Sequence, residues 1–454
     1  MTQCTQSGFD FKAYFSRDIV ARFDGGTISS DGGSLLLRQT DQRLNLLTRF
    51  ANCFLDGRRQ DRVEHSLVEM ISQRVYGLAL GYEDLNDHEQ LRKDPLFGIL
   101  TGREELDRPL AGKSTLNRLE LGNGQEDRYK KITFWKQGID EVLVSVFVES
   151  QETAPKEIIL DVDTTDLPLH GKQEGRFFHG DYDSYCYLPL YIFCGEHVLC
   201  ARLRQSNSDA ATGSLTEIER IVGQIRAAWP EVKIILRGDS GFCRNELMSW
   251  CEGHAVDYVF GLARNQRLRR IIGQQMWEAT EQWNRTHKPA RVFTDFLYQT
   301  RKVKNRGWGR ERRVVAKAEH IDGKENPRFV VTSLDSEQWS AQALYEELYC
   351  ARGDMENRIK EQFSLFADRV SAETMRANQL RLYFSVMTYV LVSGLRRLGL
   401  KATDLAQAQV STIRTKLLKI GAQIRVTVRK VWISMASSYP WQDLYEQVWT
   451  NLRC

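Results

Sequence analysis

An alternation of apolar runs with amphipathic segments, between residues 155 and 262, limits the possible folds more than any other feature of the sequence. Residues 158–163 have the pattern of a buried strand that enters a loop, and residues 215–229 have the spacing of an amphipathic helix. Residues 232–236 form a second apolar run, and a third, residues 257–262, follows a further helical pattern. Strands that alternate with helices in this way predict an α/β domain.

The segments on either side of this domain differ from it in pattern. The first 150 residues have mostly helical spacing after a glycine-rich start, and helical spacing returns at Ser340. We therefore expect five segments: a helical domain at 1–150, the first part of an α/β core at 151–264, a β-rich insertion at 265–335, the last part of the core at 336–400 and a basic C-terminal region at 401–454.

The charge balance excludes some classes of protein. The chain has 454 residues, 63 Lys and Arg against 59 Asp and Glu, and 42% hydrophobic residues. This composition excludes a disordered, collagen-like or coiled-coil chain and also a uniformly basic nucleic-acid coat. Positive surface must therefore be local. Two segments are strongly basic: residues 301–313, which surround Trp308, and residues 414–430, which contain no acidic residue.

No membrane span or disulfide framework is predicted. The longest uncharged stretch near the C-terminus, residues 382–395, is shorter than the ~20 residues that a spanning helix needs. The nine cysteines are scattered and include no Cys-x-x-Cys pair. This usage is typical of the reducing cytoplasm, and no membrane partner is expected.

Three carboxylates are placed where α/β proteins have their sites. Asp163 ends the first apolar strand, and Asp161 shares its face because side chains alternate along a strand. Asp239 ends the second strand beside glycines, and Glu356 lies on a later helix. Carboxylates at the C-terminal ends of neighbouring strands converge at one edge of a sheet.

The helix that carries Glu356 has an unusual stripe. At ~100° per residue, Tyr349, Arg352, Glu356 and Lys360 fall within about an 80° sector. An aromatic side chain, two cations and a carboxylate do not form a hydrophobic core face. Arg352 is suited to a bidentate grip on a phosphate, and Glu356 is suited to complete a set of oxygen ligands for Mg²⁺.

Together these groups predict metal-assisted chemistry on a phosphodiester. Asp163, Asp239 and Glu356 could hold two Mg²⁺ ions ~4 Å apart, which would activate water or a 3′-hydroxyl and stabilise the leaving oxygen. The alternative is structural: the two aspartates cap a turn and a helix, and Glu356 pairs with Lys360. The alternative suffices for any single residue. The three placements together favour the metal site.

These residues resemble a known family. The order Asp, Asp, Glu, with Tyr-x-x-Arg-x-x-x-Glu on a helix, resembles DDE-type insertion-sequence transposases. Further motifs along nearly the whole chain resemble the insertion-sequence family called thirteen-eighty: GYEDLND at 81–87, LRKDP at 91–95, STLNRLE at 114–120, HG at 170–171, YCYLPL at 185–190, LRGDSGF at 236–242, GLARN at 261–265, RG at 352–353, EN at 356–357, IKE at 359–361, RANQ at 376–379 and LKIGA at 418–422.

The resemblance implies a ribonuclease-H-like catalytic core with Asp163, Asp239 and Glu356 as its metal-binding triad. Asp161 is the alternative first ligand, but Asp163 is followed by Thr164, as in the family. The implied cofactor is Mg²⁺, for which Mn²⁺ can substitute. The implied partners are double-stranded DNA, as transposon ends and as target, and a second copy in a homodimer. The implied location is the bacterial cytoplasm, at the nucleoid.

The resemblance also implies DNA contacts. Relatives carry a β-rich insertion between the second Asp and the Glu, cut through a DNA hairpin and hold a flipped base against a tryptophan of the insertion. Trp308, between Arg306 and Arg310, is the first candidate for this role, and packing in a sheet is an equal alternative. Trp277 and Trp283 are rivals.

Other expected DNA contacts are Tyr349, Arg352 and Lys360 near the site. Arg118 lies on a short capped segment that reads equally as a recognition helix or as an ordinary surface helix. In some relatives a Lys follows the Glu by seven residues, where this chain has Phe363. Two other functions remain open: a metal-dependent nuclease without strand transfer, and a DNA-binding protein whose catalytic core has decayed.

Overall fold

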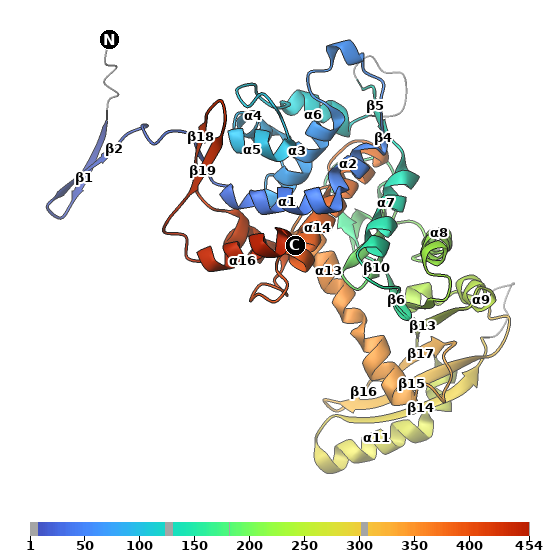
Figure 1. The fold of residues 1–454 in the computed structure, drawn as a ribbon. Helices are drawn as coiled ribbons and strands as arrows, with labels where there is room; N and C mark the ends of the chain where they lie inside the picture. The colour runs from blue at the N-terminus through green and yellow to red at the C-terminus, as the bar shows by residue number, and fades with distance from the viewer. Residues whose placement is uncertain (1–7, 123–129, 181, 301–306, 454) are drawn as a thin grey trace, which may run out of the picture. The chain divides into compact units, whose positions relative to one another are not determined.

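The computed structural model describes residues 8–122, 130–180, 182–300 and 307–453 (Figure 1). Contacts divide the chain into two units. Unit 1 comprises Met1–Ala51, Asp56–Leu119 and Leu391–Cys454, and unit 2 comprises Asn52–Leu55 and Glu120–Val390. The first unit is thus assembled from both ends of the sequence, whereas the second is almost one continuous stretch.

Unit 2 is built on a mixed sheet of nine strands within the described residues. The order is β11-β10-β6-β12-β13-β17-β15-β14, and β16 pairs with β15. The neighbours β6, β12 and β13 run parallel, and the helices α8 and α9 lie in the crossovers that parallel pairing requires. The strands are β6 Glu157–Thr164, β10 Leu190–Cys194, β11 His197–Arg202, β12 Lys233–Gly238, β13 Val256–Leu262, β14 Ala290–Tyr298, β15 Arg312–Ile321, β16 Lys324–Glu325 and β17 Arg328–Thr332.

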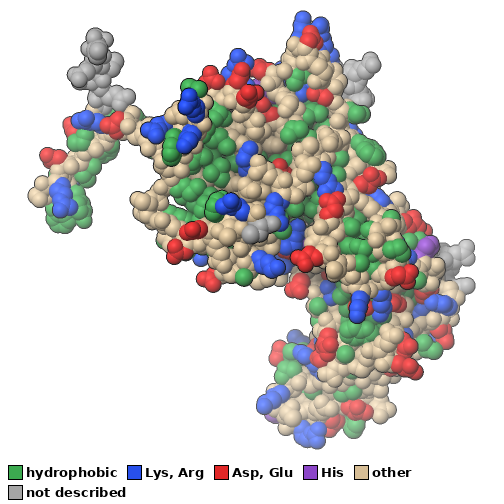
Figure 2. Space-filling view, in the orientation of Figure 1, with side chains coloured by type: hydrophobic (Ala, Val, Ile, Leu, Met, Phe, Trp, Pro, Cys, Tyr) green, Lys and Arg blue, Asp and Glu red, His purple; other side chains and the backbone are tan. Residues whose placement is uncertain are grey.

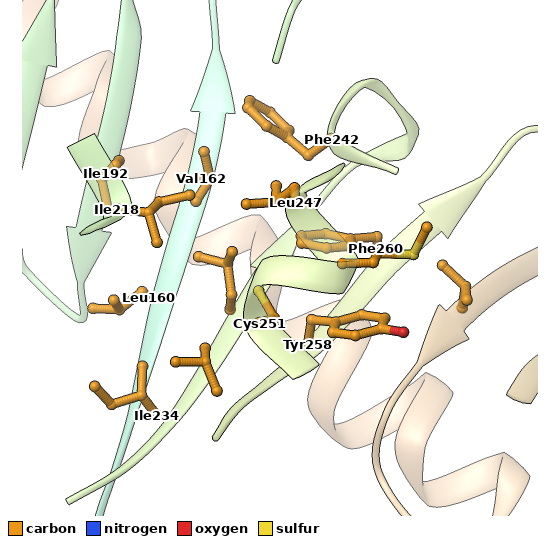
Figure 3. Packing of buried hydrophobic residues seen from close by; sticks show 14 of the residues in the cluster. Leu160, Val162, Ile192, Ile218, Ile234, Phe242, Leu247, Cys251, Tyr258 and Phe260 are labelled. Carbon is orange, nitrogen blue, oxygen red and sulfur yellow. The ribbon is translucent and has the colours of Figure 1, made fainter. Parts of the chain in front are cut away.

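One face of this sheet carries the main hydrophobic core (Figure 3). Leu160 and Val162 of β6, Ile234 of β12, and Tyr258 and Phe260 of β13 all point to it, because alternate residues of a strand share a face. Burying each such side chain contributes about 1.5–3 kcal/mol. Five helices supply the opposing side chains or cover the strands: α7 Lys136–Glu149, α8 Ser214–Ala228, α9 Asn245–Gly253, α10 Gln266–Ile271 and α11 Gly273–Thr286.

The opposite face has a smaller apolar cluster and most of the charged strand residues. Ile235, Val259 and Val330 pack there against Leu344 and Leu348. The covering segment is irregular: it comprises α12 Ala341–Ala343, the π-helical η5 Leu344–Tyr349, the 3₁₀ turn η6 Cys350–Arg352 and α13 Gly353–Phe363. Short π-helical segments are frequent at functional sites because they redirect side chains.

The rest of unit 2 is smaller. A three-stranded sheet has the order β7-β9-β8. These elements and the remaining ones assigned wholly or partly to unit 2 are β4 Phe54–Asp56, β5 Ile132–Phe134, β7 Leu167–Pro168, β8 Phe177–His179, β9 Ser184–Tyr187, η4 Ser240–Phe242 and α14 Met375–Leu398. The last turns of α14 belong to unit 1.

Unit 1 is mostly helical. Its longest helix apart from α14, α3, ends at Gly81, whose φ of +95° suits glycine. His88 is buried between Gln73 and Arg74 of α3, and burial lowers its pKa to about 3. The elements are β1 Phe9–Tyr14, β2 Arg17–Ala21, β3 Ile28–Ser29, η1 Gly32–Ser34, α1 Leu35–Leu44, α2 Leu46–Ala51, η2 Gln60–Arg62, α3 Leu67–Leu80, η3 Leu85–Asp87, α4 His88–Leu91, α5 Pro95–Thr101, α6 Lys113–Glu120, α15 Val410–Ile413, η7 Arg414–Leu418, β18 Ala422–Val426, β19 Val431–Met435 and α16 Gln442–Arg453.

Inside unit 1, a segment near the start of the sequence pairs with a segment near its end. Strand β3 pairs with β18, and the Gly32 amide donates to the Ile420 carbonyl at 2.8 Å. A Cβ atom added at Gly33 would overlap the Leu417 carbonyl oxygen. Lys419 forms an ion pair of 2.7 Å with the buried carboxylate of Asp31. The glycines of the N-terminal segment are therefore needed for a close approach of the C-terminal backbone.

The hairpin β1–β2 exposes apolar side chains. Figure 2 shows a group of hydrophobic side chains at its end, next to charged ones, and further hydrophobic patches elsewhere on the visible surface. The exposed large residues here are Phe9, Phe11, Tyr14, Phe15, Ile19 and Val20. Among the described residues, none of the helices has both the length and the apolar character required to cross a bilayer.

The observed elements differ from the predicted segments in two places. Residues 265–335 begin with α10 and α11, and the strands that follow extend the core sheet through the pairing of β17 with β13. Residues 120–149, expected within the first segment, fall in unit 2. The reason is packing: Val144 and Phe147 of α7 are part of the main core of the sheet.

Candidate active site

Two of the predicted carboxylates leave the sheet side by side. Strands β6 and β12 are parallel, and their register pairs Gly238 with Val162. Asp163 follows Val162 on β6, and Asp239 directly follows Gly238 at the end of β12. Both aspartates therefore lie at the carboxyl ends of adjacent strands. The apolar runs that form these strands thus fix the position of both carboxylates.

Asp163 is buried and interacts with the other two predicted carboxylates. Its side chain accepts a hydrogen bond from the Thr164 amide at 2.9 Å and forms an ion pair with Arg352 at 2.9 Å. Burial raises the pKa of Asp163 to about 6; Arg352 and the Thr164 amide lower it, and the negative charges of Asp239 and Glu356 raise it further. Asp239 and Glu356 therefore both lie close enough to Asp163 for their charges to disfavour its ionised form.

Glycines make room around Asp239. One carboxylate oxygen of Asp239 accepts from the Gly241 amide at 2.8 Å, and a Cβ at Gly241 would lie 2.9 Å from that oxygen. On the neighbouring strand, a Cβ at Gly261 would lie 2.6 Å from the Tyr349 hydroxyl. A side chain at Gly261 would therefore displace Tyr349 from its place beside Asp239.

Arg352 joins two of the carboxylates. Its guanidinium lies 2.9 Å from Asp163 and 3.3 Å from Glu356. Burial lowers the pKa of Arg352, but the surrounding negative groups outweigh burial and the net shift is upward. Arg352 is thus the cation that is ion-paired within this cluster of three carboxylates.

Asp161 lies on the same face of β6 but has a different partner. It forms a bidentate ion pair with Arg237 of β12, at 2.5 and 2.8 Å, and both residues are buried. Arg237 also donates to the Leu348 carbonyl at 2.5 Å, which anchors the π-helical segment. Both carboxylate oxygens of Asp161 are engaged in this pair.

The predicted helical stripe is partly assembled. Tyr349, Arg352 and Glu356 all lie near Asp163 or Asp239, although the π-helical and 3₁₀ turns replace the regular helix assumed in the prediction. Lys360 is exposed one turn beyond Glu356 on α13. In the described part of the chain, no group of three His, Cys, Asp or Glu side chains is spaced to hold a metal ion.

The structure buries the tryptophan that was the first candidate for base stacking. Trp308 is 4% exposed, and its ring packs edge-on against Tyr298 with Arg312 over it. Neither face of this ring is open to a base. Arg310 forms an ion pair with Glu252 at 3.1 Å. Arg306 lies outside the described residues.

The remaining candidates are placed as follows. Trp277 on α11 is 63% exposed, whereas Trp283 stacks on His320 with ring centres 4.7 Å apart. Arg118 is exposed on α6. Of the two rival tryptophans, Trp277 therefore has the more accessible ring.

A cavity of about 390 Å³ opens beside Asp239. Sequence reasoning did not select its two cations, Arg264 and Arg328; the GLARN motif at 261–265 was a signal for the first of them. The lining residues are Asp239, Ser240, Gly261, Leu262, Ala263, Arg264, Pro327, Arg328, Phe329, Tyr345 and Tyr349.

Comparisons with known proteins were made for the whole chain. A comparison with curated proteins found no match. A solved chain from a piggyBac transposase synaptic complex with hairpin DNA is similar, with 10% identity, a TM-score of 0.41 and coverage of 86% of this chain and 80% of that chain. The family profile described as "Transposase DDE domain group 1" matches residues 11–454. Because this match spans nearly the whole sequence, the chain belongs to the family of transposases with a group 1 DDE domain.

Proposed function

We propose that this protein is the DNA transposase of an insertion sequence and that Asp163, Asp239 and Glu356 are its catalytic carboxylates. One observation carries the proposal: Asp163 and Asp239 end adjacent parallel strands, and Arg352 links Asp163 to Glu356 on the helix that follows. The family supplies the reaction class, cleavage and joining of DNA. The motifs along the chain support the finer placement in the family called thirteen-eighty.

The core strands support the ribonuclease-H-like assignment. Numbered along the chain, β6, β10, β11, β12 and β13 have the spatial order 3-2-1-4-5, and the second strand is antiparallel to its neighbours. We assign this part of the sheet, within 151–264, to the catalytic core, and helix α13, within 336–400, to its last part. Residues 265–335 are then the insertion, which continues the same sheet.

The proposed site supplies the type of ligand that a divalent cation takes, although in the described structure its carboxylates are not spaced to hold one. Carboxylate oxygens are the ligands that Mg²⁺ prefers, and Mn²⁺ accepts the same set. We choose Asp163 over Asp161 because Arg237 engages both oxygens of Asp161. Asp163, Asp239 and Glu356 would hold such ions, which would supply activation of the attacking water or 3′-hydroxyl and stabilisation of the leaving oxygen.

Several basic and aromatic groups are available to position DNA around the carboxylates. Arg352 neutralises part of their charge in this structure, and on release its planar guanidinium is suited to a phosphate oxygen. Lys360 lies on α13, as Glu356 does, and is exposed to solvent. Trp277 is the exposed aromatic residue that we propose for stacking a flipped base, if second-strand cleavage proceeds through a hairpin.

The other segments are proposed to bind DNA ends. The helical segment within 1–150, which carries Arg118, and the basic segment within 401–454 would contact terminal inverted repeats, mainly through phosphates. We propose a homodimer because two transposon ends must be processed together. Two alternatives remain: a nuclease without strand transfer, and a DNA-binding protein with a decayed core.

A cleavage assay tests the proposal. Duplex DNA that flanks the protein's own reading frame is incubated with wild type or Asp239→Asn, in Mg²⁺ or in EDTA, with a target plasmid present. We expect Mg²⁺-dependent cuts at the element boundary and joined products for wild type, and neither for Asp239→Asn. The matched control is Glu157→Gln, a carboxylate at the opposite end of β6 that pairs with Lys233 and should retain activity.

The outcomes separate the alternatives. Cuts without joined products would identify the nuclease. Specific binding with no cutting by wild type in Mg²⁺ or Mn²⁺ would identify the decayed protein. Equal cleavage by wild type and Asp239→Asn would remove Asp239 from the site.

A further inference from the structure

The cavity beside Asp239 combines a polar wall, an aromatic wall and two cations. Asp239 and Ser240 form part of the lining, and Tyr345 and Tyr349 of the π-helical segment form another part. Arg264 follows the end of β13, and Arg328 begins β17. All of these elements belong to unit 2, so the sheet itself positions the lining.

The two arginines are available to bind an anion. In the described residues, neither Arg264 nor Arg328 forms an ion pair or a side-chain hydrogen bond, and both side chains are exposed. Their neighbours on α10 are engaged: Arg267 donates to the Gln299 carbonyl at 2.9 Å, and Arg269 pairs with Glu325 at 2.8 Å. Arg264 and Arg328 thus bring to the cavity two guanidinium groups that have no ion-pair or hydrogen-bond partner among the described residues.

The dimensions and lining suit one nucleotide. A volume of about 390 Å³ lies within the ~300–1,000 Å³ of typical ligand sites and is far too small for a duplex. Guanidinium groups bind phosphate oxygens in a bidentate manner, and the apolar side chains of Leu262, Pro327 and Phe329 offer contact to a sugar or base. Both features match a single DNA strand that passes Asp239.

We propose that this cavity binds one nucleotide of the DNA strand next to the scissile phosphate, and that Arg264 and Arg328 hold its phosphate. This inference rests on the proposed function and adds to it the residues that set the position of the strand. Arg264 and Arg328 are positioning residues: they fix the register of the strand relative to Asp239 but do not touch the reacting atoms. Since they grip a phosphate, they act on every DNA sequence alike.

The contact between the two arginines and a phosphate can be tested with DNA in which single phosphates are replaced by uncharged methylphosphonates. A series of duplexes of the flanking DNA carries one methylphosphonate at a time around the cut, and both cleavage rate and equilibrium binding are measured. For wild type, one position or two adjacent positions should slow cleavage by about ten-fold or more, because hydrogen bonds to a charged partner are lost. Arg264→Ala and Arg328→Ala should slow cleavage of the unmodified duplex to a similar extent.

The decisive result is non-additivity. At the sensitive position, the methylphosphonate should cause no further loss in Arg264→Ala or Arg328→Ala, because the contact is already absent. The matched control is Arg270→Ala, which removes an exposed cation of α10 that does not line the cavity, and it should keep the full penalty. Each cavity variant should also reduce the slope of log binding constant against log salt by about one.

The outcomes distinguish this inference from the proposed function. Wild type that cleaves, with penalties that remain additive in both cavity variants, would overturn the nucleotide site alone. Wild type that binds but does not cleave would overturn the proposed catalysis, and the binding series would still decide the contact. Thermal unfolding of each variant, with a melting temperature equal to that of wild type, shows that the exposed substitutions leave the fold intact.

Discussion

Two charged clusters lie on the same face of the same sheet and differ in charge balance. On β14 and β15, Arg291 and Lys317 each lie 2.8 Å from Glu319, and Arg291 lies 3.5 Å from Glu346. Two cations thus face two carboxylates. At the carboxyl ends of β6 and β12, the ion pairs of three carboxylates involve one cation, Arg352, which pairs with Asp163 and Glu356.

The pKa values reflect this difference. Burial tends to raise the pKa of Glu319, yet its hydrogen bonds to Lys317 and Arg291 lower it overall. Burial also raises the pKa of Asp163, and here the single cation does not compensate, so the value is about 6. The first cluster satisfies its own charges and stabilises the fold. In the second, the ionised form of Asp163 is disfavoured, and a bound cation would favour it.

The largest expected effect is on cleavage activity, and it should separate one variant in each cluster. Glu356→Gln should reduce Mg²⁺-dependent cleavage on the order of 10³-fold, since metal ligation contributes several kcal/mol to the transition state, and should leave the unfolding temperature nearly unchanged. Glu319→Gln should leave cleavage within a few-fold of wild type and lower the unfolding temperature. If both variants lost activity equally, the division between a structural and a catalytic cluster would be wrong.

A second prediction compares the two aspartates of β6. Asp161→Asn leaves Arg237 buried without its carboxylate and should lower the free energy of unfolding by about 3–5 kcal/mol. Asp163→Asn removes one of three repelling carboxylates and should lower it much less. Denaturant unfolding in EDTA measures both. Equal destabilisation would show that Asp163 is also a structural residue.

The smallest effect is in pH dependence. Because the folded-state pKa of Asp163 is raised from 3.8 to about 6, its contribution to stability is present below the unfolded value and is lost as pH rises through about 6. Between pH 4 and 7 in EDTA, Asp163→Asn should therefore gain stability relative to wild type, by at most about 3 kcal/mol. A difference between the two proteins that does not change with pH would contradict the raised pKa.

The elements that carry local patterns were predictable. The runs at 158–163 and 257–262 lie within strands of the large sheet, and the run at 232–236 overlaps β12, because continuous apolar residues require burial on a sheet face. The end of α3 at Gly81 was predictable for a similar reason: glycine accepts a left-handed conformation. Asp163 and Asp239 were selected because they follow two of these runs.

Features that depend on distant residues were not predictable. The sequence favours Asp163 over Asp161 only through the resemblance; the physical difference between them, the ion pair of Asp161 with Arg237, joins residues 76 apart through strand register. The burial of Trp308 was one of two open alternatives, and the basic residues around it could not decide between them. Arg328 lines the cavity because β17 pairs with β13, and no local sequence pattern predicts this pairing. The roles of the candidate residues stay predictions until they are tested.

The paired segments of unit 1 bear on how the protein is made. A ribosome releases the glycines at 32 and 33 long before the segment 417–422 that they contact. The last strand of the large sheet ends at Thr332. This sheet can therefore form before the C-terminal part of unit 1 has been synthesised. A premature stop codon after residue 400 would therefore spare the sheet and the carboxylates while it removes the closing piece of unit 1. Truncated products of this kind would keep the proposed chemistry and lose the proposed means of finding the transposon end.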